Sequence, residues 1–387
     1  MARLLFLNHN RYGQGTFLRC YNLGRQLAAR GHSVDLVTVS AESRYRTVRA
    51  DEGRLRIIRT PCALGGYYQS GGWGVLDILA RLSRCAAPRF DLVYAFDHRP
   101  NVSVPALVQR YLRGAPLFSD WADWWCGGGL LDDARNFPFQ FAAERRLETG
   151  MKRISAGVTV ISQALRDRAG SIGIPAERVL LLHSGADVER ISPLPRDAAR
   201  DSLGIPRGIR IAGYISANLL DAELLMRGMA RVFRRMEDCR LLFIGPDEGW
   251  HRELARGLGV DDRILWTGFQ PYARIAESLA CADILLLPMS DTAVNRGRWP
   301  NRIGEHMAAG KATVSCAVGE MKKLFEAHPI GLLARPDEED FAEKTLALLD
   351  APEAAEEMGR RARTLAEGDY SWSVLADRFV SFWRRMI

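Results

Sequence analysis

Short continuous runs of apolar residues alternate along the chain with stretches in which apolar positions recur every three or four residues. A strand buried on both faces needs the short run, whereas a helix that covers a sheet shows the 3.6-residue period. Strands of a first series are predicted at 4–7, 34–37, 92–95, 117–119, 157–161 and 179–182. A helix is predicted at 17–30, closed by Gly31 and His32. This alternation predicts an α/β fold with helices on both faces of a parallel sheet.

The same alternation starts again in the second half of the chain. Strands of this second series are predicted at 209–214, 241–244, 264–267, 284–287 and 313–316. The Pro- and Arg-rich stretch 192–208 separates the two series and is the predicted linker. Leu375, Phe379 and Trp383 have helical spacing and predict a closing helix. A chain of 387 residues exceeds what one core usually organises. We therefore expect domains at 1–190 and 191–370, followed by a closing helix at 371–387.

Two doubly wound, Rossmann-like domains have a preferred place for ligands. In such sheets, ligands bind at the carboxyl ends of the strands. When two sheets face each other across a cleft, that cleft is the expected site. No G-x-G-x-x-G follows any predicted strand, which argues against a nicotinamide-dependent enzyme.

Charge and cysteine content narrow the class of protein. The net charge of +7 and the pI of about 9.1 suit phosphate-bearing ligands or an anionic membrane surface, and a solvated basic surface is equally compatible. The seven Cys are scattered without a C-x-x-C pair, which predicts free buried thiols in a reducing compartment and no zinc site. No apolar run has the length of a membrane span or a signal peptide. We expect a cytoplasmic protein without a nucleic-acid partner.

The segment from Asn295 to Gly310 carries the most specific chemistry. Pro300 opens a predicted helix and Gly310 closes it. Asn301, Arg302 and Glu305 then share one helix face. A carboxylate can accept hydrogen bonds from both hydroxyls of a ribose, and an Arg in the first turn can hold phosphate. An exposed Arg–Glu pair on a surface helix is the alternative interpretation.

The sequence Pro300-Asn-Arg-Ile-Gly-Glu-His-Met-Ala-Ala-Gly310 resembles a donor-site motif. It is similar to Pro-(Asn/Ser)-Lys-x-x-Glu-(Tyr/Phe)-Met-Ala-Ala-Gly in one branch of the family-4 glycosyltransferases of the GT-B fold. Other family landmarks occur in order at 31–34, 160–163, 184–187, 243–245, 268–269, 282–288 and Trp372. The resemblance implies two Rossmann-like domains, with the closing helix returning to the first domain.

The resemblance also implies an activity. We expect a glycosyltransferase that moves a sugar from a nucleotide-diphosphate sugar to a glycan, lipid-linked or small-molecule acceptor. Retention of configuration is implied, and no metal or cofactor is expected beyond the donor. Glu305 is expected to bind the donor ribose, and Arg302 takes the place of the motif's Lys. The predicted donor-binding residues are Ser216, Asn218, Gly245, Gly268, Phe269, Asn295, Arg298, Asn301, Arg302 and Glu305.

The chain departs from the family pattern at two places. Gly297 stands where many members have a Glu that contacts the donor sugar. The family's Arg…Lys pair for the diphosphate should fall at 215–223, where this chain has no basic residue. Arg302, Arg298 or backbone amides must then hold the diphosphate. The departures keep two alternatives open, a non-catalytic nucleotide-sugar-binding subunit and a nucleotide-sugar epimerase on the same fold.

Polar residues that follow the strands of the first series are candidates for the acceptor side. Gly13 and Gly15 allow a tight turn after the first strand. Asp97 and His98 end a later strand, and Asp120 and Asp123 lie among tryptophans, where sugars are often recognised. A plain turn and a loop of core-capping tryptophans are the alternatives. The predicted acceptor-side residues are Asn10, Arg11, Gly13, Gln14, Gly15, Asp97, His98 and Asp123. The predicted catalytic residues are Asp120, Arg302 and Glu305.

An apolar stripe recurs with helical spacing between residues 75 and 85. Its members are Val75, Leu76, Ile78, Leu79, Leu82 and Cys85, with Arg81, Arg84 and Arg89 close by. Such a helix could rest on an acidic membrane to reach a lipid-linked acceptor, as a peripheral contact on the inner face. A helix that faces the core is the favoured interpretation.

Overall fold

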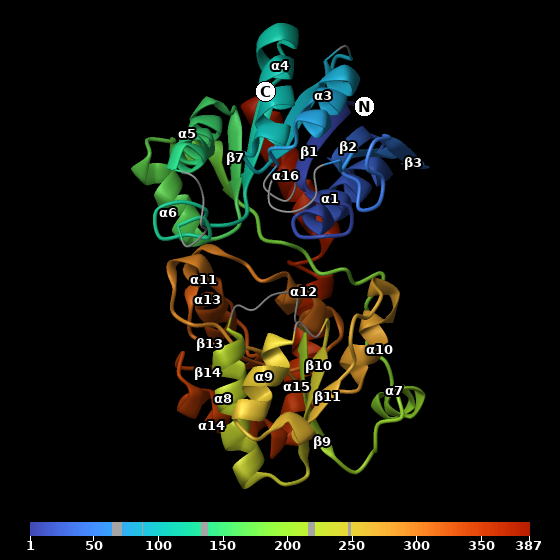
Figure 1. Cartoon of the computed structure of the whole chain (residues 1–387), viewed down its shortest axis with the longest axis vertical. Helices are drawn as coiled ribbons and strands as arrows, with labels where there is room; N and C mark the ends of the chain where they lie inside the picture. Colours follow the sequence, from blue (N-terminus) through green and yellow to red (C-terminus); the bar gives the residue numbers. More distant parts are fainter. Residues whose placement is uncertain (64–71, 87, 133–137, 216–220, 247–248) are drawn as a thin grey trace. The chain divides into compact units, whose positions relative to one another are not determined.

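The computed structural model describes residues 1–63, 72–86, 88–132, 138–215, 221–246 and 249–387 (Figure 1). The chain forms two compact units, Met1–His183 together with Trp372–Ile387, and Ser184–Ser371. The division falls after His183, so residues 184–190 lie in the second unit rather than in the first. The last residues of the chain, from Trp372 on, are part of the first unit.

An eight-stranded sheet forms the centre of the first unit. Its order is β3-β4-β2-β1-β5-β6-β7-β8, and every pair is parallel except β3 with β4. The strands are β1 (Arg3–Arg11), β2 (Ser33–Val39), β3 (Val48–Glu52), β4 (Leu55–Thr60), β5 (Leu92–Phe96), β6 (Leu117–Trp121), β7 (Gly157–Val160) and β8 (Val179–Leu181). The β3–β4 hairpin was absent from the predicted strands, because β3 lies at the sheet edge and has no apolar run.

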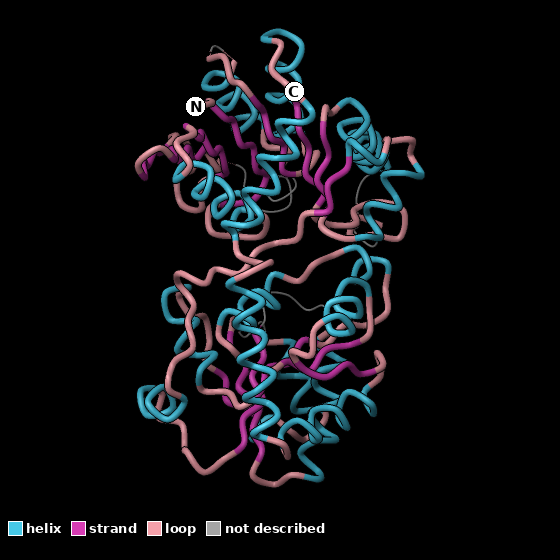
Figure 2. Tube along the Cα trace, turned by 180° about the vertical axis from the view of Figure 1, so that it is seen from behind, coloured by secondary structure: helices cyan, strands magenta, loops and turns pink. Residues whose placement is uncertain are grey.

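Helices cover both faces of this sheet (Figure 2). They are α1 (Phe17–Ala29), α3 (Val75–Cys85), α4 (Pro100–Arg113), α5 (Pro138–Ile154), α6 (Gln163–Ser171) and α16 (Trp372–Met386), and the turn η1 (Ala176–Arg178) precedes β8. The alternation of side chains along β1 separates two cores. Leu4 and Phe6 pack with α1 and α16, whereas Leu5 and Leu7 pack on the face of α3, α4 and α5.

The second unit contains a six-stranded parallel sheet of order β11-β10-β9-β12-β13-β14. The strands are β9 (Arg210–Ile215), β10 (Cys239–Ile244), β11 (Ile264–Trp266), β12 (Ile284–Leu287), β13 (Thr313–Cys316) and β14 (Gly331–Ala334). Counted within the unit, this is the 3-2-1-4-5-6 order of a doubly wound nucleotide-binding fold. The sequence predicted all of these strands except the edge strand β14.

The helices of the second unit connect successive strands. They are α7 (Arg196–Ser202), α8 (Ala222–Arg235), α9 (Trp250–Gly257), α10 (Ile275–Ala280), α11 (Ala293–Gly297), α12 (Asn301–Ala308), α13 (Gly319–Ala327), α14 (Glu338–Leu349) and α15 (Pro352–Glu367), with short turns η2 (Asp261–Arg263) and η3 (Tyr272–Arg274).

The stretch 192–208 was expected to be a linker, and the structure corrects this. It contains α7, whose Arg200 is buried and lies 2.9 Å from Asp283. The guanidinium of Arg200 also donates to the carbonyl oxygens of Cys281 and Ile209. A buried Arg must satisfy its donors, and these partners hold α7 against the second unit.

The closing helix α16 completes the core of the first unit. Phe379 is fully buried, stacks on Tyr94 of β5 at a centroid distance of 4.7 Å, and meets Phe118 of β6 edge-on at 6.1 Å. Outside the core, Arg30 forms a two-point ion pair with Asp377. The last residues of the chain therefore stabilise a sheet formed by its first half.

We expect Phe379→Ala to destabilise the first unit by about 3–5 kcal/mol, because it leaves a cavity next to two aromatic rings. Calorimetric unfolding should show the loss in one transition. Phe269→Ala is the matched control, because Phe269 is 75% exposed and its loss should cost within about 0.5 kcal/mol. Equal effects of the two substitutions would contradict the assignment of α16 to this core.

Candidate active site

Each sheet has one point at which the strand order reverses, and there the loops after two adjacent strands diverge. In the first unit this point lies between β1 and β5, and in the second unit between β9 and β12. Among the described residues, two that are not glycine have a positive φ, Asp97 at 91° and Asp221 at 66°. Asp97 follows β5, and Asp221 lies between β9 and α8. Strained backbone of this kind is concentrated at functional sites, because its cost of about 1–3 kcal/mol needs a compensating constraint.

The Asp221 carboxylate connects the two loops at the reversal point of the second unit. One oxygen accepts from the backbone N–H of Ser290 at 2.8 Å and from the Asn295 amide at 2.9 Å. The other oxygen lies 2.8 Å from a guanidinium nitrogen of Arg298. Asn295 also donates to the Ser290 carbonyl. Asp221 therefore fixes Arg298 at the carboxyl edge of the sheet.

The predicted charged residues of α12 lie beside this network. The Arg302 guanidinium stands over the ring of Tyr214 in β9, 5.2 Å from its centroid. Glu305, one turn later, is half-buried. Burial raises the pKa of Glu305 to about 7, the negative charge of Asp187 acts in the same direction, and the charge of Arg302 opposes them. The Tyr272 hydroxyl contacts Asp187, and its pKa is raised by burial and by the charges of Glu305 and Asp187.

Other predicted donor residues lie on loops after neighbouring strands. Gly245 follows β10 and has a φ of 140°, and its N–H donates to the Gly268 carbonyl at 3.1 Å. Phe269 is exposed, and Asn301 is exposed at the start of α12. Ser216 and Asn218 lie outside the described residues. Asn295 is buried and hydrogen-bonded, so its side chain serves the loop that carries Arg298.

A buried cluster of charged side chains occupies the reversal point of the first unit. Asp97 lies 3.0 Å from His9 Nδ1 on β1 and 2.5 Å from His98 Nδ1. The other ring nitrogen of His98 lies 3.0 Å from Glu144 on α5. Glu144 also accepts from Arg99 and from the Trp73 indole, both at 2.6 Å. Arg99 in turn stands over the Trp125 ring, 4.5 Å from its centroid.

The charges within this cluster are fixed by its geometry. Burial lowers the pKa of His9 to about 4, against the opposing charge of Asp97. Burial also acts to lower the pKa of His98, but Asp97 and Glu144 outweigh it and raise this pKa. His98 therefore lies between two carboxylates that favour its protonated form, whereas burial favours the neutral ring of His9. Because both nitrogens of His98 face carboxylates, His98 is unsuited to act as a general base.

The loop after β1 is formed as a tight turn. Gly13 and Gly15 have φ values of 80° and 55°, and a Cβ on Gly15 would come within 2.8 Å of the Asn10 side chain. The Asn10 carboxamide oxygen accepts from the Thr16 N–H at 2.9 Å, which closes the turn. Asn10 thus has a structural role here, while Gln14 is exposed and Arg11 half-buried. Asp123, on the loop after β6, is also half-buried.

The structure places Asp120 away from solvent and favours a structural role over the catalytic role expected from the sequence. Its carboxylate is almost fully buried in β6 and forms a two-point ion pair with Arg19 of α1, with both distances 2.9 Å. Thr159 of β7 donates to the same carboxylate. Arg19 is further held by the carbonyl oxygens of Leu182 and His183. Both oxygens of Asp120 are therefore engaged within the fold.

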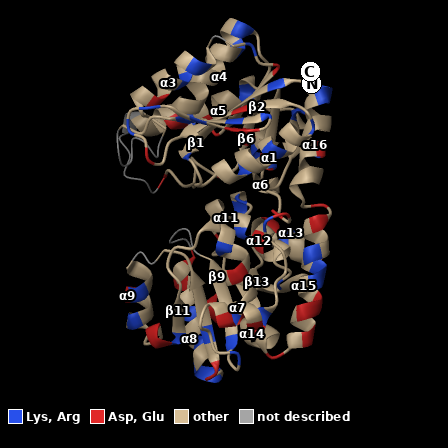
Figure 3. Cartoon of the chain, turned by 90° about the vertical axis from the view of Figure 1, so that its right-hand side faces the viewer, with Lys and Arg blue, Asp and Glu red and all other residues tan. Residues whose placement is uncertain are grey.

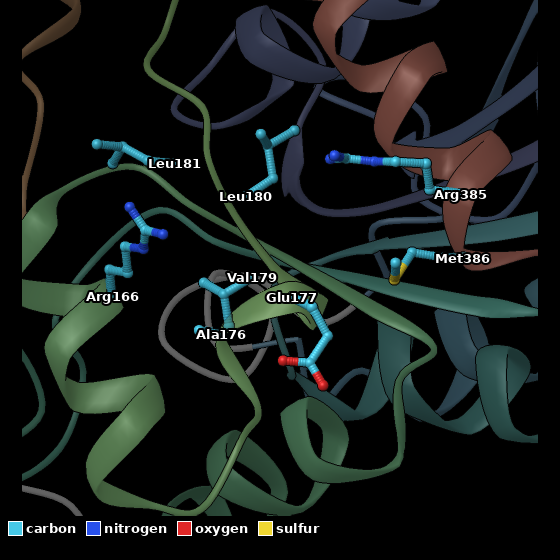
Figure 4. A pocket seen from close by; sticks show the side chains of 8 residues that line it. All are labelled: Arg166, Ala176, Glu177, Val179, Leu180, Leu181, Arg385 and Met386. Atoms are coloured by element: carbon cyan, nitrogen blue, oxygen red, sulfur yellow. The ribbon is translucent and has the colours of Figure 1, made fainter.

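A separate cavity of the first unit has a volume of about 460 Å³ and opens beside the edge strand β8 (Figure 4). Its lining residues are Arg166, Ala176, Glu177, Val179, Leu180, Leu181, Arg385 and Met386. They include none of the predicted site residues.

Among the residues that the structure describes, we find no group of three or more His, Cys, Asp or Glu suited to hold a metal ion. No helix within the described ranges of the chain is long and apolar enough to cross a membrane. The seven Cys are all buried and unpaired.

Several residues of the two sites went unpredicted from the sequence. Glu144 completes the buried cluster, and Asp221, Tyr214 and Asp187 surround the charged residues of α12. One feature of the sequence could have indicated Asp221: it lies in the segment where the family's basic residues are missing. Glu144 carried none, because an acidic residue within a helix is usually solvated.

Comparisons with known proteins agree with this geometry. Residues 14–185 match the family model "Glycosyl transferase 4-like domain", and residues 206–351 match "Glycosyl transferases group 1". A D-inositol 3-phosphate glycosyltransferase 1 from Catenulispora acidiphila is 27% identical over 77% of this chain and 73% of its own length. An alpha-D-kanosaminyltransferase from Streptomyces kanamyceticus is 24% identical over 94% and 98%. The match to a D-inositol 3-phosphate glycosyltransferase from Nocardia farcinica spans 53% of that protein.

Solved structures share the fold over the full length. A sucrose-phosphate synthase from Thermosynechococcus elongatus has a TM-score of 0.78 at 17% identity and covers 99% of this chain and 98% of its own. Anabaena HepE in complex with UDP-glucose has a TM-score of 0.73 at 16% identity, with 100% of both chains covered. Two doubly wound units, each with its own reversal point, define the GT-B fold. The chain belongs to the family-4-like glycosyltransferases, and it is a transferase.

The raised pKa of Glu305 predicts how stability depends on pH. Between the usual value of 4.5 and about 7, the native state holds a proton that the unfolded chain releases. The stabilisation is therefore present below pH 4.5 and is lost as pH rises through 7. We expect Glu305→Gln, which stays neutral, to match the wild type at pH 4.5 and to raise the free energy of unfolding by about 2–3 kcal/mol at pH 8.

Urea unfolding at both pH values measures this difference. Glu357→Gln is the control, because the pKa of the half-buried Glu357 is lowered by its hydrogen bond to Arg361, so this substitution should bring no gain at pH 8. A pH-independent effect of Glu305→Gln would show that Glu305 is ionised normally in the free protein.

Proposed function

We propose that this enzyme transfers a sugar from a nucleotide-diphosphate sugar, held by the second unit, to a glycan, lipid-linked or small-molecule acceptor that contacts the first unit. We propose further that the transfer retains the anomeric configuration and needs no metal ion. The observation that carries this proposal is the arrangement of Arg302 and Glu305 on one face of α12, beside the reversal point of the second sheet.

The donor assignment rests on chemistry that matches a ribose diphosphate. A poorly solvated carboxylate such as Glu305 gains from accepting two hydroxyl hydrogen bonds, and perturbed pKa values are concentrated at functional sites. Arg302 and Arg298 supply the positive charge that the loop after β9 lacks. Asp221 holds Arg298 in place, at 2.8 Å. Gly245, Gly268 and Phe269, on loops after β10 and β11, are the proposed contacts of the nucleoside.

The acceptor assignment rests on the buried cluster at the reversal point of the first unit. His98 carries a fixed positive charge and Asp97 a strained backbone, so this edge of the sheet is rigid and polar. Gln14, Arg11 and Asp123 are the accessible polar side chains on the loops nearby, and we propose that they meet the acceptor. Asn10 acts through the turn that it closes.

Retention is supported by the state of the carboxylates. An inverting enzyme needs a base that can reach the acceptor hydroxyl. Asp97 is occupied by His9 and His98, and Asp120 by Arg19. In the proposed mechanism the departing phosphate takes the acceptor's proton on the same face, while fixed charges stabilise the phosphate and an oxocarbenium-like sugar. Guanidinium groups and the N-terminus of α12 would serve in place of a metal ion.

Nucleotide binding separates the roles of the two α12 side chains. We expect Arg302→Gln to weaken binding of a nucleoside diphosphate roughly tenfold to a hundredfold and to change nucleoside binding little. Glu305→Gln should weaken both, because the ribose is common to them. Isothermal titration with UDP, GDP and ADP and their nucleosides identifies the base and measures these effects. Arg227→Gln, at an exposed Arg of α8, is the matched control and should leave affinity unchanged. Equal losses for diphosphate and nucleoside in Arg302→Gln would place the phosphate elsewhere.

The product of the reaction tests the function directly. An α-linked donor incubated with the enzyme and an acceptor panel should give an α-linked product, with the same rate in EDTA as in Mg²⁺, measured by NMR of the anomeric proton. A β-linked product would overturn retention and would direct attention to His9, whose neutral ring faces Asp97. Restoration of activity by Mg²⁺ alone would overturn metal independence. Release of an epimer without acceptor would identify an epimerase.

A further inference from the structure

Helix α3 in the first unit turns charged side chains toward the protein interior and several apolar side chains toward solvent. Val75, Leu76 and Leu79 are 60%, 47% and 55% exposed, whereas Asp77 and Arg81 are 4% and 0% exposed. A helix that covers a sheet normally buries its leucines and exposes its charges. The apolar stripe expected to face the core therefore points largely to solvent, and the favoured interpretation of the sequence is wrong for these residues.

The buried charges explain how the helix is held in this orientation. Asp77 accepts from Thr60 at 2.5 Å, from Arg81 at 2.6 Å and from the Asn101 side chain at 2.8 Å. Arg81 also donates to the carbonyl oxygens of Asn8 and Asn101, at 2.9 and 3.0 Å. These partners lie at the ends of β4 and β1 and at the start of α4. Rotating α3 to bury its leucines would break this network and leave a buried charge unpaired, which is costly.

The neighbouring helix extends the apolar surface. Helices α3 and α4 pack together (Figure 1), and the last turn of α4 exposes Tyr111 and Leu112, by 66% and 73%. Exposed apolar side chains gathered on two neighbouring helices indicate an interaction site. We define the α3–α4 patch as Val75, Leu76, Leu79, Tyr111 and Leu112.

The exposed charges around the patch are predominantly positive. Arg84, Arg89 and Arg113 are exposed on or beside the two helices. Within residues 75–86 and 88–114 that the structure describes, the acidic residues are Asp77 and Asp97, which are buried, and Asp91, which accepts from the Arg3 N–H. Figure 3 shows Lys and Arg in blue on both helices. Leucines and a tyrosine rimmed by arginines fit an anionic lipid surface, where each basic residue adds attraction and the apolar side chains enter the interface.

The patch is also continuous with the proposed acceptor half-site. Trp73, two residues before Val75, donates to Glu144 of the buried cluster at 2.6 Å. Asn101, which anchors α3, follows His98 and Arg99 at the start of α4. A lipid-linked acceptor at a bilayer surface would therefore lie close to the residues proposed to receive it.

We propose that the α3–α4 patch docks the enzyme on an anionic bilayer. The proposal deepens the acceptor assignment in the proposed function, and its test is independent of catalysis. Binding to vesicles with and without 30% phosphatidylglycerol in phosphatidylcholine is measured by co-sedimentation, at low salt and at 0.5 M NaCl. Wild type should bind the anionic vesicles, more weakly in high salt because screening shortens the reach of the arginines.

Matched variants locate the surface. Leu79→Glu and Arg84→Glu should each weaken vesicle binding, Leu79→Glu at least about tenfold, since an inserted leucine is replaced by a charge. Leu194→Glu and Arg234→Glu are the controls, because Leu194 is exposed by 42% in the second unit and Arg234, like Arg84, lies in the last turn of an amphipathic helix. The controls should bind as wild type does, and all four should keep the melting temperature.

Three results would overturn the proposal: no binding of wild type to anionic vesicles, unchanged binding of Leu79→Glu, or a lipid-free dimer that Leu79→Glu dissociates in analytical ultracentrifugation. The last would assign the patch to a second copy of the chain. If Leu79→Glu loses vesicle binding but still transfers sugar to a soluble acceptor, docking and the transfer reaction are separate functions of the protein. If the wild type binds vesicles but shows no sugar transfer, the proposed function fails and the docking proposal is unaffected.

Discussion

The burial of both faces of each parallel sheet determines where this enzyme can do chemistry. Strands such as β1, β5 and β12 are apolar on both sides because helices cover them, so a polar ligand has no access to a sheet face. The strand ends remain, and at the carboxyl edge the loops diverge where the strand order reverses. In both units this point is occupied by an aspartate with positive φ, Asp97 and Asp221. In both units, an aspartate therefore occupies the point at which the two loops diverge.

Each of these aspartates connects the loop after one strand to the loop or end of its neighbour. Asp221 joins the loops after β9 and β12 through Ser290, Asn295 and Arg298. Asp97 joins the ends of β5 and β1 through His9. The chain lacks the basic residues that its family usually has after β9, and an acidic residue instead holds Arg298 from the other loop. A positive charge at this edge of the second sheet is thereby held on the loop after β12.

The sequence predicted the central strands of both sheets and the motif of α12, because these depend on local apolar runs and on helical spacing. It missed the β3–β4 hairpin and β14; β3 and β14 lie at sheet edges, and β3 has no apolar run. It also proposed Asp120 for chemistry, although the Asp120 carboxylate is paired with Arg19, 101 residues away in the sequence. Pairing over such a distance leaves no local signal. Glu144 went unnoticed for the same reason, since it acquires its role from residues on other elements.

Helix α3 shows why spacing alone could not decide which side of an amphipathic helix is buried. The stripe Val75, Leu76 and Leu79 has the period of a core-facing helix, and a periodic pattern specifies a face but no neighbour. The neighbour is decided by Asp77 and Arg81, which form five hydrogen bonds when they face inward. The Asp77–Arg81 pair hydrogen-bonds to polar groups of β1 and β4. The stabilisation from burying this pair is larger than the stabilisation from burying three apolar side chains at the edge of a core. The hydrogen-bond network of Asp77 and Arg81 with β1, β4 and the start of α4 therefore turns these apolar side chains outward.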